Sequence, residues 1–183
     1  DRMVLDEIDD PDVGPGRVVV DVEAVGLAFP DVLQCRGEYQ VKPPLPFTPG
    51  SETAGRVSAV GDDVDSAILG RRVVALGGGL AERLVLPASS VFEVPDVLAS
   101  TKAAAVPMNY GTTWFALHDR AHLAPGETLL VTGAAGGVGS AAIQLGKAAG
   151  AWVIAVAGGP EKVAACTGLG ADEVIDHREV DDL

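Results

Sequence analysis

A strand, a glycine-rich turn and the start of a helix are predicted within residues 129–147, and this unit constrains the fold more than any other stretch. A short apolar run ends at Thr132, glycines follow at 133, 136, 137 and 139, and from Ser140 apolar residues recur at helical spacing. Such a turn lets the backbone approach a pyrophosphate, while the unpaired N–H groups and the dipole of the helix face the anion. The spacing Gly133-x-x-Gly136-x-x-Gly139 is a variant of the usual dinucleotide fingerprint. The glycine pattern alone is therefore a weak indication of dinucleotide binding, and the flanking segments strengthen it.

The segments around this turn predict a β-α-β-α-β order. A helix is expected over residues 140–149, a buried Val- and Ile-rich strand over 152–157, a helix over 161–169 and a short strand over 173–175. Upstream, a short helix over 100–106 stops before a proline. A second helix begins at Trp114, and the spacing places Trp114, Leu117 and Ala121 on one apolar face.

The first half of the chain has a different pattern. Short β-type runs occur at 17–25, 54–60, 72–76 and 81–86, with Gly- and Asp-rich turns between them. The first run alternates with period 2 and has one largely polar face. Several short strands at this spacing indicate a small barrel or sandwich. We therefore expect two domains, a barrel-like substrate domain over 1–95 and a dinucleotide-binding domain over 96–183.

Charge and cysteine content exclude several function classes. The formal net charge of −13 argues against binding to nucleic acid or to an anionic membrane, because their phosphates would be repelled. An anionic cofactor can still bind where backbone amides outweigh a diffuse surface charge. Cys35 and Cys166 are too few for a zinc cluster or a disulfide framework. No apolar run reaches membrane-spanning length and no leader pattern is seen, so a soluble cytoplasmic protein is expected.

The end of the strand over 152–157 indicates which dinucleotide binds. Sites for NAD usually place an acidic residue there, hydrogen-bonded to the ribose 2′-hydroxyl. This chain has Ala157-Gly158-Gly159-Pro160, and no carboxylate occurs before Glu161. Lys162 and His177 are candidates to bind a 2′-phosphate, although Lys162 is equally compatible with a solvated helix position. The sequence therefore favours NADP(H) over NAD(H).

Tyr39 and Cys35 are the first-half residues with conceivable chemistry. Tyr39 lies in a loop beside Gly37 and a proline-rich stretch at 43–50. It can be an aromatic side chain packed against proline, or a wall or hydrogen-bonding group of a substrate cleft. Cys35 has no histidine near it in sequence, so a small buried residue is the simpler interpretation than a nucleophile.

Five stretches together resemble the zinc-independent quinone oxidoreductases, or zeta-crystallin-like proteins, of the medium-chain dehydrogenase/reductase superfamily. The stretches begin at Gly26 (Gly-Leu-Ala-Phe-Pro-Asp-Val-Leu), Gly37 (Gly-Glu-Tyr-Gln-Val-Lys-Pro-Pro), Asn109 (Asn-Tyr-Gly-Thr-Thr), Gly133 (Gly-Ala-Ala-Gly-Gly-Val-Gly) and Val174 (Val-Ile-Asp-His-Arg-Glu). The resemblance covers nearly the whole chain in the family's order. It implies an α/β plus β fold, with an N-terminal chaperonin-10-like β-barrel, a partial Rossmann sheet and an active site in the cleft between them.

The resemblance also assigns roles to individual residues. It implies that the pyrophosphate loop is formed by Ala135, Gly136, Gly137 and Val138, and that the 2′-phosphate end of the site is formed by Gly158, Lys162 and His177. Thr112 resembles the family's threonine near the nicotinamide, and Tyr39 resembles a tyrosine at the substrate cleft. The chain departs from the family at Ala28, often asparagine, and at Leu33, often tyrosine, two positions that line the nicotinamide and substrate region in the family.

No metal site is expected. Zinc relatives in the superfamily carry Gly-His-Glu where this chain has Gly50-Ser51-Glu52, and a serine cannot replace the imidazole ligand. The three histidines do not form a ligand spacing with a cysteine or carboxylate cluster. They are His118, His122 and His177.

The function implied is an NADPH-dependent reduction of quinones or other α,β-unsaturated carbonyls without zinc, with Tyr39 as a conceivable hydrogen-bond donor to the carbonyl. An enoyl-thioester reductase and a non-catalytic, crystallin-like NADPH-binding protein are the alternatives. The family continues beyond the last residues of this chain, so the resemblance implies a sequence incomplete at both ends. It also implies a homodimer of the complete protein. A half-sheet is expected to expose apolar edges and faces and to be poorly stable alone.

Overall fold

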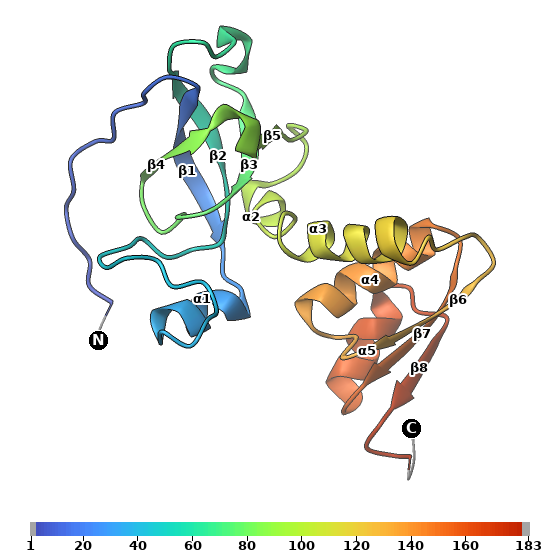
Figure 1. Ribbon diagram of the computed structural model, residues 1–183. Helices are drawn as coiled ribbons and strands as arrows, with labels where there is room; N and C mark the ends of the chain where they lie inside the picture. The colour runs from blue at the N-terminus through green and yellow to red at the C-terminus, as the bar shows by residue number, and fades with distance from the viewer. Residues whose placement is uncertain (1–2, 181–183) are drawn as a thin grey trace. The chain divides into compact units, whose positions relative to one another are not determined.

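The computed structural model describes residues 3–180 and divides the chain into two compact units, one up to Met108 and one from Asn109 onward (Figure 1). The sequence predicted the boundary at 95/96. Residues 96–108 lie with the first unit because helix α2 (Ser100–Ala103) packs on two of its strands.

The first unit is built on a five-stranded antiparallel sheet with the order β4-β1-β2-β3-β5. Its strands are β1 (Arg17–Gly26), β2 (Glu52–Val60), β3 (Arg72–Leu76), β4 (Arg83–Pro87) and β5 (Val91–Glu93). Helix α1 (Phe29–Cys35) and two 3-10 turns, Ser66–Ile68 and Ala88–Ser90, lie in the connections. The strands predicted from the sequence are all present. The short β5 was not predicted, because three residues carry too little periodicity to be recognised.

Apolar side chains cover both faces of this sheet. Val18, Val20 and Val57 belong to a buried cluster on one face, and α2 contributes alanines to a second cluster that includes Ala54. Strand β1 departs from the predicted alternation, since Val19 is also buried, with 7% of its surface exposed. The pairing of β1 with β2 shifts register between Val19 and Val20, and such a bulge interrupts the period-2 pattern.

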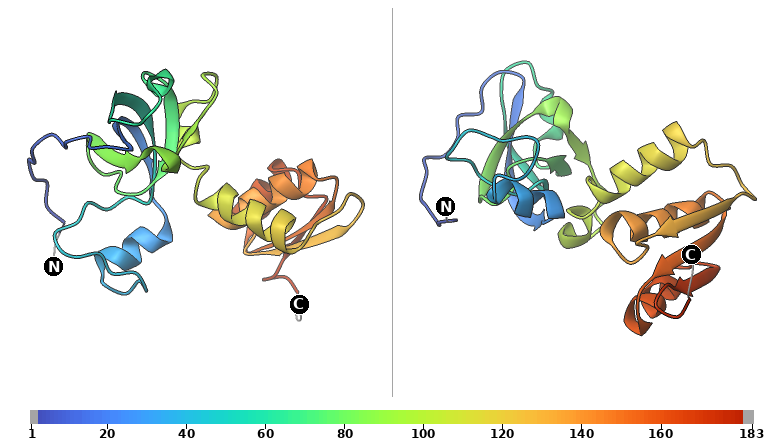
Figure 2. Two further views of the ribbon diagram at one scale, coloured as in Figure 1. Left: turned by 45° about the horizontal axis from the view of Figure 1, so that its top comes forward. Right: turned by 60° about the horizontal axis from the view of Figure 1, so that its bottom comes forward.

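The second unit has the β-α-β-α-β order that the sequence predicted, in a parallel sheet of order β6-β7-β8. Its elements are α3 (Asn109–Trp114), a π-helical segment (Phe115–Arg120), β6 (Thr128–Thr132), α4 (Gly137–Ala148), β7 (Trp152–Ala157), α5 (Pro160–Gly168) and β8 (Glu173–Asp176). Helix α4 packs on β6 and β7, and α5 packs on β7 and β8. Because right-handed crossovers step in one direction, both helices lie on the same face of the sheet. Helix α3 runs alongside α4 (Figure 2).

The covered face of this sheet holds the core of the second unit, including Val131, Val153 and Ile143 of α4. On the opposite face Leu130 is 58% exposed, and Trp152 is 52% exposed. The expected exposure of apolar strand residues is therefore present.

The helix predicted from Trp114 differs from the structure. It begins earlier, at Asn109, and continues as a π-helical segment from Phe115. Leu117 is buried as predicted, but Trp114 is 54% exposed and Ala121 is also exposed. The prediction assumed a constant period of 3.6 residues, and the wider π turn rotates the residues on either side of it out of phase.

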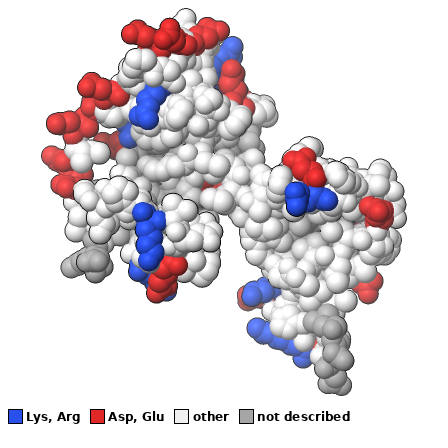
Figure 3. All heavy atoms as spheres, viewed as in Figure 1, with Lys and Arg blue, Asp and Glu red and all other residues white. Residues whose placement is uncertain are grey.

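Acidic side chains dominate part of the first unit's surface. In the view of Figure 3 they gather over the segment before β1 and over the turn after β2, where the exposed carboxylates are Asp6, Glu7, Asp9, Asp10, Asp12, Asp62 and Asp63. The absence of a nucleic-acid partner stays a prediction. Within residues 3–180, no helix has both the length and the apolar character needed to cross a bilayer.

Candidate functional site

The glycine turn between β6 and α4 presents free backbone donors. The first N–H groups of any α-helix have no intrahelical partner. In the twelve-residue helix α4 they also receive no side-chain capping bond, because the N-cap residue is Gly136. Gly136, Gly137 and Val138 are exposed, and Ala135 is half-buried. Exposed N–H groups at a helix N-terminus attract an anion, so this part of the structure fits a pyrophosphate.

Gly139 lets α4 approach the end of β6. A Cβ atom built on Gly139 would lie 2.5 Å from the carbonyl oxygen of Gly133 and 2.7 Å from the Cα atom of Ala134. The helix begins at Gly137, three residues before the predicted start. The prediction treated Gly137 and Gly139 as part of the turn, whereas both belong to the first turn of the helix. The third glycine of the motif therefore has a packing role, as in the dinucleotide fingerprint.

Helix α3 lies directly against this turn. The hydroxyl of Thr113 donates to the carbonyl oxygens of Asn109 and Val138, at 2.8 and 3.2 Å. A Cβ on Gly137 would lie 2.6 Å from Asn109 Oδ1. Thr112, the residue predicted to lie near the nicotinamide, is the exposed neighbour of Thr113 on this helix.

The end of β7 is organised by Asp176, at the end of β8. Both carboxylate oxygens of Asp176 accept the N–H of Gly159, at 3.1 and 3.0 Å, and one oxygen also accepts the N–H of Arg178 at 3.0 Å. The backbone N–H groups of Arg178 and Gly159 hold the pKa of Asp176 below its ordinary value. The Asp176 carboxylate is thus engaged with the backbone of the turn.

This arrangement brings two basic side chains to the Gly158–Gly159 backbone. A Cβ on Gly158 would lie 2.5 Å from His177 Nε2 and 3.1 Å from Arg178 Nε, and one on Gly159 would lie 3.0 Å from Arg178 Nη1. The structure therefore joins the predicted residues Gly158 and His177. Arg178 was not predicted, although it directly follows His177 in the sequence. Lys162 is exposed in the first turn of α5.

Tyr39, the predicted catalytic residue, is held by the end of α1. Gly37 has φ +69°, and the N–H groups of Gly37 and Glu38 donate to the carbonyl oxygens of Gln34 and Leu33. This is a Schellman motif, in which glycine adopts the left-handed conformation after a helix. The N–H of Tyr39 also donates to Leu33, at 3.2 Å. Two residues after the glycine, Tyr39 is therefore fixed by the backbone and half-buried.

Tyr39 lines a cavity of about 410 Å³ in the first unit, together with Gln34, Thr48, Ser51 and Met108. A cavity of this size with a few polar groups fits a small organic molecule.

A buried carboxylate supports the wall of this cavity. Ser51 Oγ donates to Asp31 Oδ1 at 2.5 Å, and the N–H of Ala28 donates to Asp31 Oδ2 at 2.7 Å. Asp31 is only 4% exposed. The sequence placed Asp31 and Ser51 in separate motifs, and no local signal indicated that they would meet.

Glu52 supports a second part of the wall. Its carboxylate accepts the N–H of Met108 at 2.9 Å, and only 2% of the residue is exposed. Burial raises the pKa of Glu52, partly offset by the hydrogen bond from Met108 and reinforced by the neighbouring charge of Asp31.

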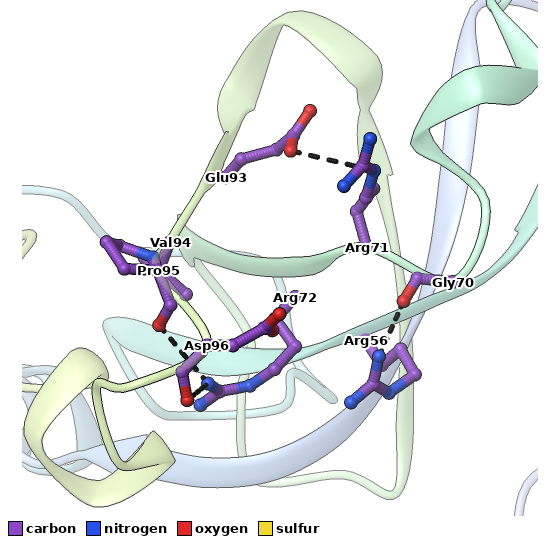
Figure 4. Close-up of a pocket in the computed structure, with 8 residues that line it drawn as sticks. All are labelled: Arg56, Gly70, Arg71, Arg72, Glu93, Val94, Pro95 and Asp96. Atoms are coloured by element: carbon purple, nitrogen blue, oxygen red, sulfur yellow. Dashed lines mark hydrogen bonds and ion pairs between the residues drawn. The ribbon is translucent and has the colours of Figure 1, made fainter.

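A second hollow, of about 450 Å³, lies on the surface of the first unit and contains three arginines (Figure 4). Arg72 donates to the carbonyl oxygens of Pro95, Asp96 and Leu98 and to Ser100 Oγ. Arg56 donates to the Gly70 carbonyl at 2.6 Å, and Arg71 lies 3.8 Å from Glu93. Arg72 ties β3 to the segment after β5, and the other two arginines pair with neighbouring groups of the same sheet and its turns, so the cluster is structural.

The part of the chain that the structure describes contains no group of three or more His, Cys, Asp or Glu side chains arranged to hold a metal ion. The expectation of no metal site stays a prediction.

Two family models match the chain. Residues 14–96 match the alcohol dehydrogenase GroES-like domain, and residues 137–183 match the zinc-binding dehydrogenase family. The first match covers the sheet of the first unit, and the second begins at the N-terminus of α4. Together they support the predicted fold, a chaperonin-10-like barrel domain followed by a Rossmann-type parallel sheet.

Comparison with known proteins agrees with this assignment. Quinone oxidoreductase-like protein 2 homolog of Nematostella vectensis is 41% identical over 179 residues, which is 96% of this chain and 49% of that protein. The structure of the Thermus thermophilus quinone oxidoreductase, also solved with NADPH, is similar with a TM-score of 0.85 and 40% identity, over 96% of this chain and 56% of that one. CurK enoyl reductase is similar with a TM-score of 0.86 and 31% identity, over 96% and 56% of the two chains.

The chain spans about half the length of the curated relatives that it matches over nearly its whole sequence. Over the residues present, the fold, the glycine turn and the similarity to quinone oxidoreductases all indicate the same family. The chain belongs to the quinone oxidoreductase family of the medium-chain dehydrogenase/reductase superfamily.

Proposed function

We propose that the protein is an NADPH-dependent reductase of quinones or other α,β-unsaturated carbonyls that works without zinc. The observation that carries this proposal is the end of β7, where His177 and Arg178 lie against Gly158 and Gly159. Asp176, the carboxylate at the end of β8, is engaged with the backbone N–H groups of this turn. Basic side chains at this turn suit a 2′-phosphate, and the hydrogen bonds of Asp176 occupy the carboxylate that would otherwise suit a ribose 2′-hydroxyl.

The residues of the second unit would hold the cofactor along its length. The free N–H groups at the start of α4 bind the pyrophosphate, and Lys162, His177 and Arg178 bind the 2′-phosphate. The exposed Thr112 on α3 is the candidate contact to the nicotinamide. When bound, the reduced nicotinamide supplies a hydride to an electron-poor carbon of the acceptor.

The cavity of the first unit would take the acceptor. The Tyr39 hydroxyl can donate a hydrogen bond to the carbonyl oxygen on which negative charge develops. Conjugation in a quinone or enone already stabilises that charge, so the reaction does not require a Lewis acid. Ser51, where zinc relatives have histidine, fits this metal-free chemistry.

Paired titrations of the chain with NADPH and NADH test the cofactor assignment. We expect the wild-type chain to bind NADPH at least tenfold more tightly than NADH. Arg178→Gln should weaken NADPH binding by about tenfold, the lower end for a hydrogen bond to a charged group because the site is exposed. NADH affinity should stay within about twofold. Arg120→Gln, an exposed arginine in the same unit, is the control and should change neither affinity.

Equal affinity for both dinucleotides in the wild-type chain would contradict the assignment to NADPH. An Arg178→Gln variant that binds NADPH like wild type would remove Arg178 from the site and leave Lys162 and His177 as the candidate residues.

Turnover separates the proposed reaction from its alternatives. NADPH oxidation is followed with quinones, free enones and acyl-thioester enones. Oxidation by quinones supports the proposal, whereas a preference for the thioester would favour an enoyl reductase, the activity named for the similar CurK protein. Tight NADPH binding without turnover by any acceptor would indicate a non-catalytic binding protein. A cytoplasmic homodimer of the complete protein belongs to the same proposal, and sedimentation measures its oligomeric state.

A further inference from the structure

The Ser51–Asp31 pair gives one wall of the first unit's cavity a fixed hydrogen-bond polarity. Ser51 lines the cavity, and its hydroxyl donates to Asp31 Oδ1 at 2.5 Å. The second oxygen of Asp31 accepts the N–H of Ala28 at 2.7 Å. Asp31 is 4% exposed and lies at the third position of α1, so the packing of the helix start holds the carboxylate in place.

The chemistry of the Asp31 carboxylate and the Ser51 hydroxyl decides whether Ser51 can donate a hydrogen bond to a ligand or only accept one. An ionised carboxylate can only accept, and a serine hydroxyl has one proton and two acceptor lone pairs. The proton of Ser51 is therefore committed to Asp31. Ser51 can offer a ligand only an acceptor, whereas the polar groups of Gln34, Thr48 and Tyr39 can each donate.

From this geometry we infer that Ser51 selects acceptors that carry a neutral hydroxyl near the reducible carbonyl. The inference rests on the proposed function and names the substrate class of the same cavity. A ligand hydroxyl satisfies the oxygen of Ser51, whereas an ether or a carboxylate brings lone pairs against it. The Asp31 carboxylate, which accepts hydrogen bonds from both Ser51 and Ala28, disfavours an anionic substituent further.

Two matched quinones test the inference, 2-(hydroxymethyl)- and 2-(methoxymethyl)-1,4-naphthoquinone. In the second compound a methyl group replaces the hydroxyl proton of the first. Their dissociation constants are measured on the 183-residue chain by ligand-observed NMR titration, without cofactor and without turnover. In Ser51→Ala, the preference for the hydroxymethyl compound over the methoxymethyl compound should fall by about three- to tenfold, the range of a neutral hydrogen bond.

Asp31→Asn provides a readout that a merely structural role of the pair would not produce. The amide of asparagine can donate to Ser51 Oγ while its oxygen still accepts from Ala28, which frees the serine proton for the ligand. The affinity for the methoxymethyl compound should then rise toward that for the hydroxymethyl compound, because the oxygens of both ligands can accept the freed serine proton, and the wild-type preference should disappear.

A matched control lies in β2, the strand that begins directly after Ser51. Ser58 Oγ donates to Asp21 Oδ1 at 2.8 Å in the same kind of pair, but Ser58 is exposed and lies outside the cavity. Ser58→Ala should leave the ratio of the two affinities at its wild-type value.

The outcomes separate this inference from the proposed function. Loss of the preference in Ser51→Ala through weaker binding of the hydroxymethyl compound, together with its loss in Asp31→Asn through tighter binding of the methoxymethyl compound, supports the inference, even in a chain that does not oxidise NADPH. A ratio that stays within twofold of wild type in both variants overturns it, even in a chain that reduces quinones. Failure of the folded wild-type chain to bind either quinone also overturns it.

Discussion

Replacement of Gly139 by alanine is predicted to destabilise the second unit, whereas the same replacement at Gly111 is predicted to stabilise it. A methyl group at Gly139 would lie 2.5 Å from the Gly133 carbonyl oxygen and 2.7 Å from Ala134 Cα. Both atoms belong to the backbone, so the overlap, about 1 Å against a normal contact of about 3.5 Å, cannot be relieved by rotating a side chain. At Gly111, within α3, a methyl group would meet no atom within 4 Å.

The two magnitudes follow from different terms. Overpacking against a rigid neighbour costs about 1–3 kcal/mol, and a backbone contact this close belongs at the upper end. Replacing glycine by alanine within a helix stabilises it by up to about 1 kcal/mol, and this gain applies at both sites. Gly139→Ala should therefore lose about 2 kcal/mol, and Gly111→Ala should gain up to about 1 kcal/mol. For a domain of this size, about 4–8 °C per kcal/mol gives shifts of roughly −8 to −16 °C and up to about +8 °C.

Tryptophan fluorescence isolates the unit concerned. The chain has two tryptophans, Trp114 and Trp152, and both lie in the second unit. Thermal unfolding followed by their emission therefore reports on this unit without a contribution from the sheet of the first. The reasoning is refuted if Gly139→Ala melts at the wild-type temperature or above it. NADPH affinity should fall together with stability in Gly139→Ala, because relief of the overlap moves the start of α4.

Two further predictions concern buried charges of the first unit, with amide hydrogen exchange of β2 and β3 as the measurement. Burial raises the pKa of Glu52 above its ordinary value of 4.5, so the folded state holds this proton more tightly than the unfolded state. Stability should therefore be lost as the pH rises through 4.5 toward the raised pKa. Glu52→Gln, which can still accept from Met108, should lack this decline, and an unchanged pH profile would contradict the prediction. Arg72→Met should cost about 3 kcal/mol, because three carbonyl oxygens lose a charged donor. The control Arg71→Met, whose wild-type side chain is 61% exposed, should change stability by less than about 1 kcal/mol; equal losses in the two arginine variants would refute the assignment.

Sequence reasoning succeeded where a local pattern determines the structure. The strands, the glycine turn and the β-α-β-α-β order follow from periodicity and from turn residues. Gly37 stands two residues after the last residue of α1, the position of a common helix terminator, so the end of this helix also follows a local rule. The exposure of Trp114 was missed, since a π turn leaves no recognisable pattern in a single sequence.

The candidate site was predicted less completely, because its most informative contacts join distant segments. Asp31 and Ser51 are twenty residues apart, and Glu52 and Met108 are fifty-six apart. No periodicity connects such pairs. Arg178 was within reach of prediction, since it directly follows His177. Only the hydrogen bonds from Gly159 and Arg178 to Asp176 explain why the guanidinium lies at the β7 turn.

The proposed site divides its recognition between two kinds of contact. In the second unit, backbone N–H groups and basic side chains fit the constant parts of a dinucleotide. In the first unit, two buried carboxylates each fix one polar group of the cavity wall, Asp31 the Ser51 hydroxyl and Glu52 the Met108 amide. A buried carboxylate is unfavourable unless its hydrogen bonds are satisfied, so these two constrain the cavity strongly. Choice of acceptor and choice of dinucleotide should consequently respond to different substitutions. Asp31→Asn should change the quinone preference at unaltered NADPH affinity, and Arg178→Gln should do the reverse.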